Sequence, residues 1–108
     1  EVDFGIPSKF ELSQNYPNPF NPATKIKFTI PNITLSSSSR AESRDEGSRV
    51  QLKVFDILGN EVSTLVNGYL EAGTYEIDYN ASELSSGFYI YKLESGSYVQ
   101  TRKMMLLK

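Results

Sequence analysis

The sequence predicts an all-β protein, an immunoglobulin-like antiparallel β-sandwich of about seven strands. The 108 residues suit a single domain. Seven tyrosines and six phenylalanines supply all the aromatic content, and both residue types are enriched in strands. Short alternating segments recur, with turn signals about every 8–12 residues, as in antiparallel sandwiches. The one helical stretch is too short for a helical bundle.

The N-terminal residues predict a linker followed by a first strand. Residues 1–9 mix polar and apolar types without a period and include one glycine and one proline. We expect them to link the domain to an upstream one, because the sequence opens with neither an initiator methionine nor a signal peptide. "FELSQNY" (10–16) then predicts a short strand with Phe10 and Leu12 on one face.

The next strand and the segment after it contrast strongly. Residues 24–31 alternate, which directs Ile26, Phe28 and Ile30 toward the core, and Pro31 has no N–H with which to continue the ladder. Residues 32–49 are rich in serine and charge, so few apolar groups offset the entropy cost of ordering. We expect a mobile insertion there, within a domain spanning 10–108.

The middle of the chain predicts a strand, a tight turn and a second strand. Residues 50–58 begin in one alternating phase and change to the other at Phe55, which indicates a bulge or cover on both faces. Residues 58–61 predict a turn, because Gly59 and Asn60 both accept a positive φ. We expect a short strand over 61–66 and a connection over 67–73.

The last third predicts three more strands. Residues 74–80 alternate tyrosine and isoleucine with acidic residues. "ASELSSG" (81–87) favours a single helical turn or a crossover that ends at Gly87. Two further strands, 88–94 and 98–107, are joined by "SGS", a tight hairpin signal.

Composition argues against several classes of function. There is no cysteine and no histidine, which removes thiolate nucleophiles, the commonest general base and the commonest metal ligands. The net charge of −2 does not suit a nucleic-acid surface, which needs clustered lysine and arginine. No apolar run approaches the roughly 18 residues of a membrane span. We therefore expect no catalytic residues, no cofactor and no metal.

Residues 15–24, "NYPNPFNPAT", hold three of the five prolines. Each proline disfavours the helical conformation of the residue before it, so the segment should be a stiff, extended corner between two strands. We expect Phe20 to point inward and to anchor this corner.

The ordered motifs support a family resemblance. The chain resembles the C-terminal sorting domain of the type IX secretion system, type A, from "FELSQNYPNPFNPATKIKFTIP" to "VQTRKMMLLK". The Pro-Asn-Pro-Phe block, a D-x-x-G-x-x-V turn, two G-x-Y units and a basic last strand carry the likeness. The turn and the two units comprise Asp56, Gly59, Val62, Gly73, Tyr75, Gly87 and Tyr89. Residues 32–49 fall where the family has a short connection.

The resemblance implies an address label for secretion. Such a domain directs an attached N-terminal cargo through the periplasm to the outer-membrane translocon. A surface sortase then removes it, and the cargo stays at the cell surface or outside the cell. We expect the translocon to recognise the proline corner and the last strand, whose edge or terminal carboxylate offers a point of capture. The residues expected in that surface are Pro17, Asn18, Pro19, Phe20, Lys103 and Lys108.

Two other classes of function remain open. The sandwich also resembles the immunoglobulin-like domain of the flagellar hook-capping protein, which suggests a structural module. A carbohydrate- or protein-binding accessory module of a surface protein is a further alternative, and it would need a row of exposed aromatic residues. The tyrosines available for such a row are Tyr69, Tyr89, Tyr91 and Tyr98. The alternating pattern places Tyr89 and Tyr91 in the core or half-buried.

Overall fold

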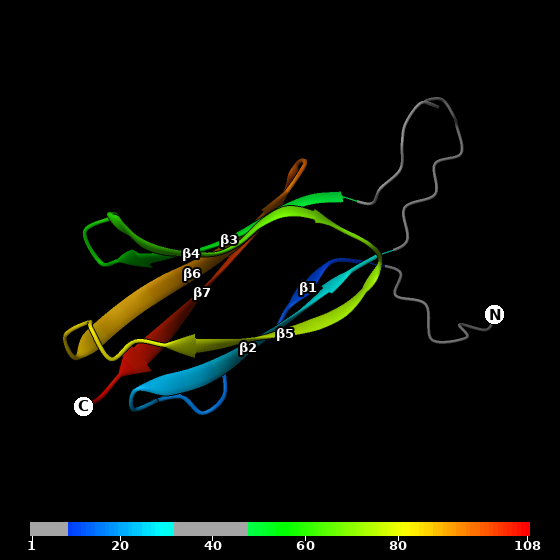
Figure 1. The fold of residues 1–108 in the computed structure, drawn as a ribbon. Helices are drawn as coiled ribbons and strands as arrows, with labels where there is room; N and C mark the ends of the chain where they lie inside the picture. Colours follow the sequence, from blue (N-terminus) through cyan, green and yellow to red (C-terminus); the bar gives the residue numbers. More distant parts are fainter. Residues whose placement is uncertain (1–8, 32–47) are drawn as a thin grey trace, which may run out of the picture.

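The computed structural model describes residues 9–31 and 48–108, which form two packed antiparallel sheets (Figure 1). The three-stranded sheet has the order β1-β2-β5, and the four-stranded sheet has the order β4-β3-β6-β7. The strands are β1 (Glu11–Leu12), β2 (Ala23–Ile30), β3 (Ser48–Asp56), β4 (Glu61–Leu70), β5 (Gly73–Asn80), β6 (Gly87–Ser95) and β7 (Tyr98–Leu106). The predicted all-β sandwich of seven strands is confirmed.

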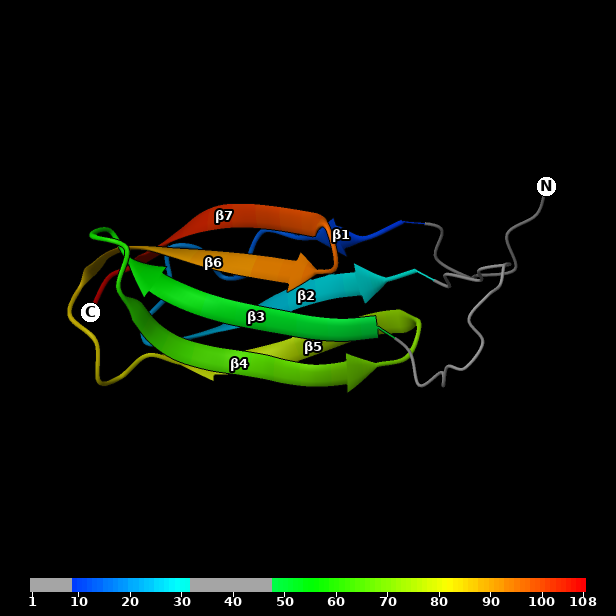
Figure 2. The same ribbon diagram turned by 90° about the horizontal axis from the view of Figure 1, so that it is seen from above.

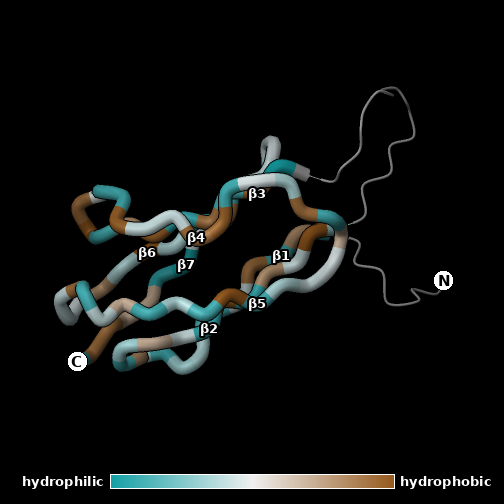
Figure 3. Tube along the Cα trace, viewed as in Figure 1, coloured by the Kyte–Doolittle hydropathy of each residue, from teal (hydrophilic) through white to brown (hydrophobic). Residues whose placement is uncertain are grey.

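The core lies between the sheets and follows the alternation of the strands. In β2 the side chains of Ile26, Phe28 and Ile30 are buried, whereas Lys25 and Lys27 are exposed. Facing residues of β3, β6 and β7 complete the core, namely Val50, Leu52, Val54, Tyr89, Tyr91, Leu93, Met104 and Leu106. Figure 3 shows apolar stretches recurring along the strands, and also an apolar stretch at the turn after β3. Ile57 and Leu58 of that turn are exposed.

β4 is longer than the sequence predicts. It runs to Leu70 rather than ending at residue 66, so most of the expected connection over 67–73 is strand. Its register with β3 shifts twice, and the shifts leave Val62 and Leu65 without a direct partner. Such β-bulges break the period of two, so the sequence resembles a loop where the strand continues.

Other boundaries also differ from the prediction. β3 begins at Ser48, so the last two residues of the expected insertion are strand, and residues 32–47 lie outside the described residues. Residues 1–8 of the expected linker also lie outside them. β1 contains only two residues, although Ser13 and Tyr16 still donate their N–H groups to Lys27 and Lys25. Residues 81–86 form a crossover that contains a turn but no helix, so the second of the two alternatives expected there is the one observed.

The two ends of the sandwich carry different features. The proline corner, the β3–β4 turn, the 81–86 crossover and the C-terminus lie at one end, which we call the corner end (Figures 1 and 2). The described chain enters at the other end, beside the β4–β5 connection and the β6–β7 hairpin. Residues 12–20 then run alongside β7 in the same direction, as the parallel bridge between Phe20 and Leu106 shows.

Candidate functional site

The proline corner, residues 15–22, connects β1 to β2 and presents Pro17 and Pro19 to solvent. Pro17, Asn18 and Pro19 are exposed, whereas Phe20 is only 2% exposed and belongs to the core. The predicted inward anchor is therefore confirmed. The peptide bonds that precede the corner's three prolines are all cis.

A buried polar network holds the corner from below. Asn15 is 2% exposed, and its Nδ2 donates to the carbonyl of Pro17 at 3.1 Å and to Thr24 Oγ1 at 3.0 Å. The Thr24 hydroxyl donates to that same carbonyl at 2.9 Å. Buried polar groups are stable only when they are paired. The network therefore fixes the first half of the corner in one conformation.

Tyr91 of β6 joins this network from the opposite sheet. Its hydroxyl donates to the carbonyl of Ser13 at 2.6 Å and accepts the backbone N–H of Asn15 at 2.7 Å. The side chain is fully buried, and this burial raises the pKa of Tyr91 to about 12. The phenol thus ties the segment before the prolines to the centre of the four-stranded sheet.

The second half of the corner pairs with the end of β7. Phe20 donates its N–H to the carbonyl of Met105 and accepts the N–H of Leu107, each at 2.9 Å. Asn18 Oδ1 accepts the N–H of Met105, also at 2.9 Å. The edge of β7 was expected to be free for capture, but over these residues it is already occupied by the corner.

Lys103 and Lys108 lie on either side of this pairing. The carbonyl of Lys103 accepts a bond from Gln14 Nε2 at 2.9 Å, and its ammonium group lies 5.0 Å from the centre of the Phe88 ring. The ammonium group of Lys108 donates to the carbonyls of Ser82 and Leu84 at 2.7 and 2.9 Å. Lys108 therefore fixes the crossover in place. Of the six residues expected in the recognised surface, Phe20 is buried, and the other five are exposed.

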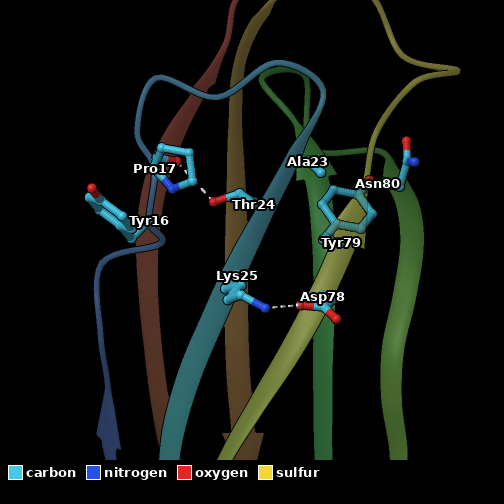
Figure 4. A pocket seen from close by; sticks show the side chains of 8 residues that line it. All are labelled: Tyr16, Pro17, Ala23, Thr24, Lys25, Asp78, Tyr79 and Asn80. Carbon is cyan, nitrogen blue, oxygen red and sulfur yellow. Dashed lines mark hydrogen bonds and ion pairs between the residues drawn. The ribbon is translucent and has the colours of Figure 1, made fainter.

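A pocket of about 530 Å³ opens beside the corner, near the start of β2 and the end of β5 (Figure 4). An ion pair of 2.8 Å between Lys25 and Asp78 crosses it, and the hydrogen bond to Asp78, followed by that carboxylate's charge, raises the pKa of Lys25. The residues that line the pocket are Tyr16, Pro17, Ala23, Thr24, Lys25, Asp78, Tyr79 and Asn80. It contains no pairing of a nucleophile with a base.

The D-x-x-G-x-x-V motif builds the turn between β3 and β4. Asp56 Oδ1 accepts the N–H groups of Leu58 and Asn60 at 3.0 and 2.9 Å, and Gly59 has a φ of 92°. These donors, Asn60 first, lower the pKa of the Asp56 carboxyl. Val62, which follows the turn, is half-buried against the core. The motif is thus a structural turn.

The two G-x-Y units share one local structure. Gly73 and Gly87 have φ values of 151° and 150°, and each begins a strand. The hydroxyl of Tyr75 donates to the carbonyl of Glu71 at 2.6 Å, and that of Tyr89 donates to the carbonyl of Ser85 at 2.7 Å. In each unit, therefore, a tyrosine bonds to the backbone four residues upstream, as in the tyrosine corner of immunoglobulin-like sandwiches.

The comparison with protein families decides what this arrangement is. The family model described as the secretion system C-terminal sorting domain matches residues 14–107, which include the proline corner, the Asp56 turn and both G-x-Y units. The chain belongs to this family. The sorting domain is thus a C-terminal sorting signal for type IX secretion, which takes proteins through the outer membrane to the cell surface. Neither the curated proteins nor the solved structures gave a match to the chain.

A carbohydrate-binding module would need a row of exposed tyrosines in the described part of the sorting domain. Tyr89 and Tyr91 are buried as predicted, and Tyr69 is exposed. Tyr98 is half-buried, and the centre of its ring lies 4.5 Å from that of Phe10, on which it stacks. These tyrosines form no exposed row. No group of three or more potential metal ligands occurs among residues 9–31 and 48–108. That same part of the chain contains no helix with the length and hydropathy of a membrane span.

Sequence reasoning missed the buried network under the corner. Asn15, Thr24 and Tyr91 were not among the residues expected in the recognised surface, and Tyr91 was considered only for the tyrosine row. All three are buried. One signal was available, since Thr24 is a polar residue in the same alternating phase as Ile26 and Phe28. A polar residue in a core phase indicates a buried hydrogen-bond partner.

Proposed function

We propose that the type IX translocon recognises one composite surface at the corner end of the sorting domain. This surface consists of the exposed Pro17–Pro19 turn, the outer face of β7 at Lys103 and the Lys108 terminus. Phe20 supports it from inside. After transit through the periplasm, a surface sortase cuts near residues 1–9 and releases the attached cargo. The domain itself carries out no catalysis.

The pairing of the corner with β7 is the observation that supports this proposal. Three bonds of 2.9 Å join Asn18 and Phe20 to Met105 and Leu107, so two distant family motifs form a single unit. Proline fixes φ, and the buried network fixes the neighbouring backbone. A surface that is already ordered loses little conformational entropy on binding. A receptor that handles many cargoes would benefit from such a rigid feature.

A matched pair of lysine variants tests the recognised surface. Residues 1–108 are fused behind a Sec signal and a fluorescent reporter and expressed in a bacterium with a type IX system. We expect each of the single variants Lys103→Ala, Pro17→Ala and Pro19→Ala to reduce the amount of reporter at the cell surface several-fold. Lys27→Ala serves as the control, because Lys27 is also an exposed strand lysine but lies on the other sheet. Equal export of both lysine variants would contradict the composite surface.

Folding and cleavage are measured on the same samples. Circular dichroism of each purified variant distinguishes lost recognition from lost structure. The mass of the released cargo then tests sortase cutting: a new C-terminus near residues 1–9 is expected, and it should be absent in a sortase mutant. Cargo that keeps the whole domain would contradict removal without affecting the sorting assignment.

A further inference from the structure

The four edges of the two sheets are not equally available to a new strand. The edge of β7 is paired with the proline corner at Met105 and Leu107, β1 is only two residues long, and β4 is interrupted by two bulges. β5 pairs with β2 over eight consecutive residues without a register shift. β7 is equally regular in its pairing with β6, but part of its own outer edge is already occupied. Among the described residues, nothing pairs with the backbone on its other side. A long, regular, unpaired edge is a template for strand addition.

The groups that face this edge follow from the antiparallel register. Ala81 donates its N–H to the carbonyl of Pro22 at 2.8 Å, which sets the phase in which β5 bonds to β2. Backbone groups alternate between the two sides of a strand. Tyr75, Ile77 and Tyr79 therefore bond to β2. The free N–H and C=O groups belong to the residues between them, namely Thr74, Glu76, Asp78 and Asn80.

The side chains of β5 specify what an added strand must carry. Glu76 and Asp78 are exposed on the outer face, whereas Tyr75 and Ile77 are half-buried against the core. An added strand would place alternate side chains opposite these two sets. It therefore needs basic residues facing the carboxylates and apolar residues facing the tyrosine and the isoleucine.

β2 already shows this complementarity on the occupied side of β5. Lys25 lies opposite Asp78 with an ion pair of 2.8 Å, and Lys27 lies opposite Glu76. The Phe28 ring stacks on that of Tyr75 at 5.4 Å. The sequence of β2, ATKIKFTI, is thus an example of a strand that fits β5.

The local charge favours a basic partner and disfavours a second copy. Glu76 and Asp78 are exposed on β5, and the lysines opposite them, Lys25 and Lys27, lie on β2, on the occupied side of β5. If two copies paired antiparallel through β5 around Ile77, Glu76 of each would face Asp78 of the other. Like charges in direct opposition destabilise strand pairing.

We propose that the free edge of β5 binds an extended segment of a partner protein in which basic and apolar residues alternate. The segment adds to the three-stranded sheet as a fourth strand. This inference does not rest on the proposed function, because the free edge of β5 faces away from β2 and β1 and contains no residue of the composite surface.

Two capped peptides test the proposal on the 108-residue chain. One has the sequence of residues 23–30, ATKIKFTI, and the other is ATEIEFTI, in which both lysines are replaced by glutamate. Fluorescence anisotropy measures affinity, and NMR hydrogen exchange reports on single amides. We expect the lysine peptide to bind at least about fivefold more tightly than the glutamate peptide. We also expect it to slow exchange of the Thr74, Glu76 and Asp78 amides, which should exchange quickly in the free protein.

A charge reversal at the edge provides the matched control. Glu76→Lys should weaken the lysine peptide and strengthen the glutamate peptide, whereas simple unfolding would abolish binding of both. Three results would overturn the proposal. The first is equal affinity for the two peptides. The second is slow hydrogen exchange of the three amides before any peptide is added. The third is exchange of these amides that slows as the protein concentration rises, without peptide. The last of these would indicate a second copy at the edge.

Discussion

Tyr91→Phe removes one oxygen atom from the centre of the molecule and tests whether the proline corner depends on it. The hydroxyl makes two short bonds, to the carbonyl of Ser13 and from the N–H of Asn15, in a fully buried position. Phenylalanine keeps the ring and its packing. Any change should therefore come from the two lost bonds.

The expected cost follows from the two groups left behind. Leaving a buried donor unpaired costs about 1–3 kcal/mol, and the second bond contributes about 0.5–1.5 kcal/mol. We expect the free energy of unfolding to fall by about 3 kcal/mol. For a domain of this size, that corresponds to a melting temperature lower by roughly 12–24 °C.

Urea denaturation and thermal melting measure this loss, with Tyr69→Phe as the control because Tyr69 is 63% exposed. The dependence of stability on pH in the alkaline range gives a second measure of the role of this hydroxyl. The pKa of Tyr91 is about 12 in the folded protein against 10.0 for an ordinary tyrosine. The unfolded chain therefore loses this proton first, so the wild type should lose stability as pH rises from 10 to 12. The Phe variant should lose less over that range. A cost below about 0.5 kcal/mol, the usual limit for a neutral surface change, would refute the reasoning.

Two further substitutions test the turns. Gly87→Ala should cost about 1–3 kcal/mol, because a φ of 150° is nearly restricted to glycine, whereas Gly68→Ala in β4 should be neutral or stabilising. Equal urea midpoints for these two variants would show that Gly87 is not conformationally required. Asp56→Ala should lower the urea midpoint at pH 7, and its difference from the wild type should shrink below about pH 4. The reason is that the hydrogen bonds that lower the pKa of Asp56 stabilise the fold only while its carboxylate is ionised. A difference that persists unchanged at pH 2 would contradict this account.

The regular strands could be predicted because their alternation is a local property. In β2, Ile26, Phe28 and Ile30 recur at every second position, and Pro31 marks the end. β4 could not be predicted in full, since the bulges at Val62 and Leu65 interrupt its period. An Asn67-Gly68 pair then resembles a turn, although both residues lie within the strand.

The site was predicted where it depends on short motifs and missed where it depends on distant contacts. The inward position of Phe20 follows from its place among prolines, and the Asp56–Gly59 turn follows from turn chemistry. The bond from Asn15 to Tyr91 joins residues 76 positions apart, so no local pattern reports it. The pairing of Phe20 with Leu107 likewise depends on how the sheets pack.

The parallel course of residues 12–20 and β7 has a mechanical consequence. The described chain enters at one end of the sandwich, and its C-terminus lies at the other (Figure 1). Tension between Lys9 and Lys108 would pull these two neighbouring segments in opposite directions along their length. The bonds that join them, from Arg102 to Leu12, from Gln14 to Lys103 and from Phe20 to Met105 and Leu107, would then bear the load together. Such shear requires several bonds to break at once, whereas peeling would break them one at a time. The same contacts that order the corner would thus allow the folded domain to withstand a pull on the polypeptide attached ahead of it.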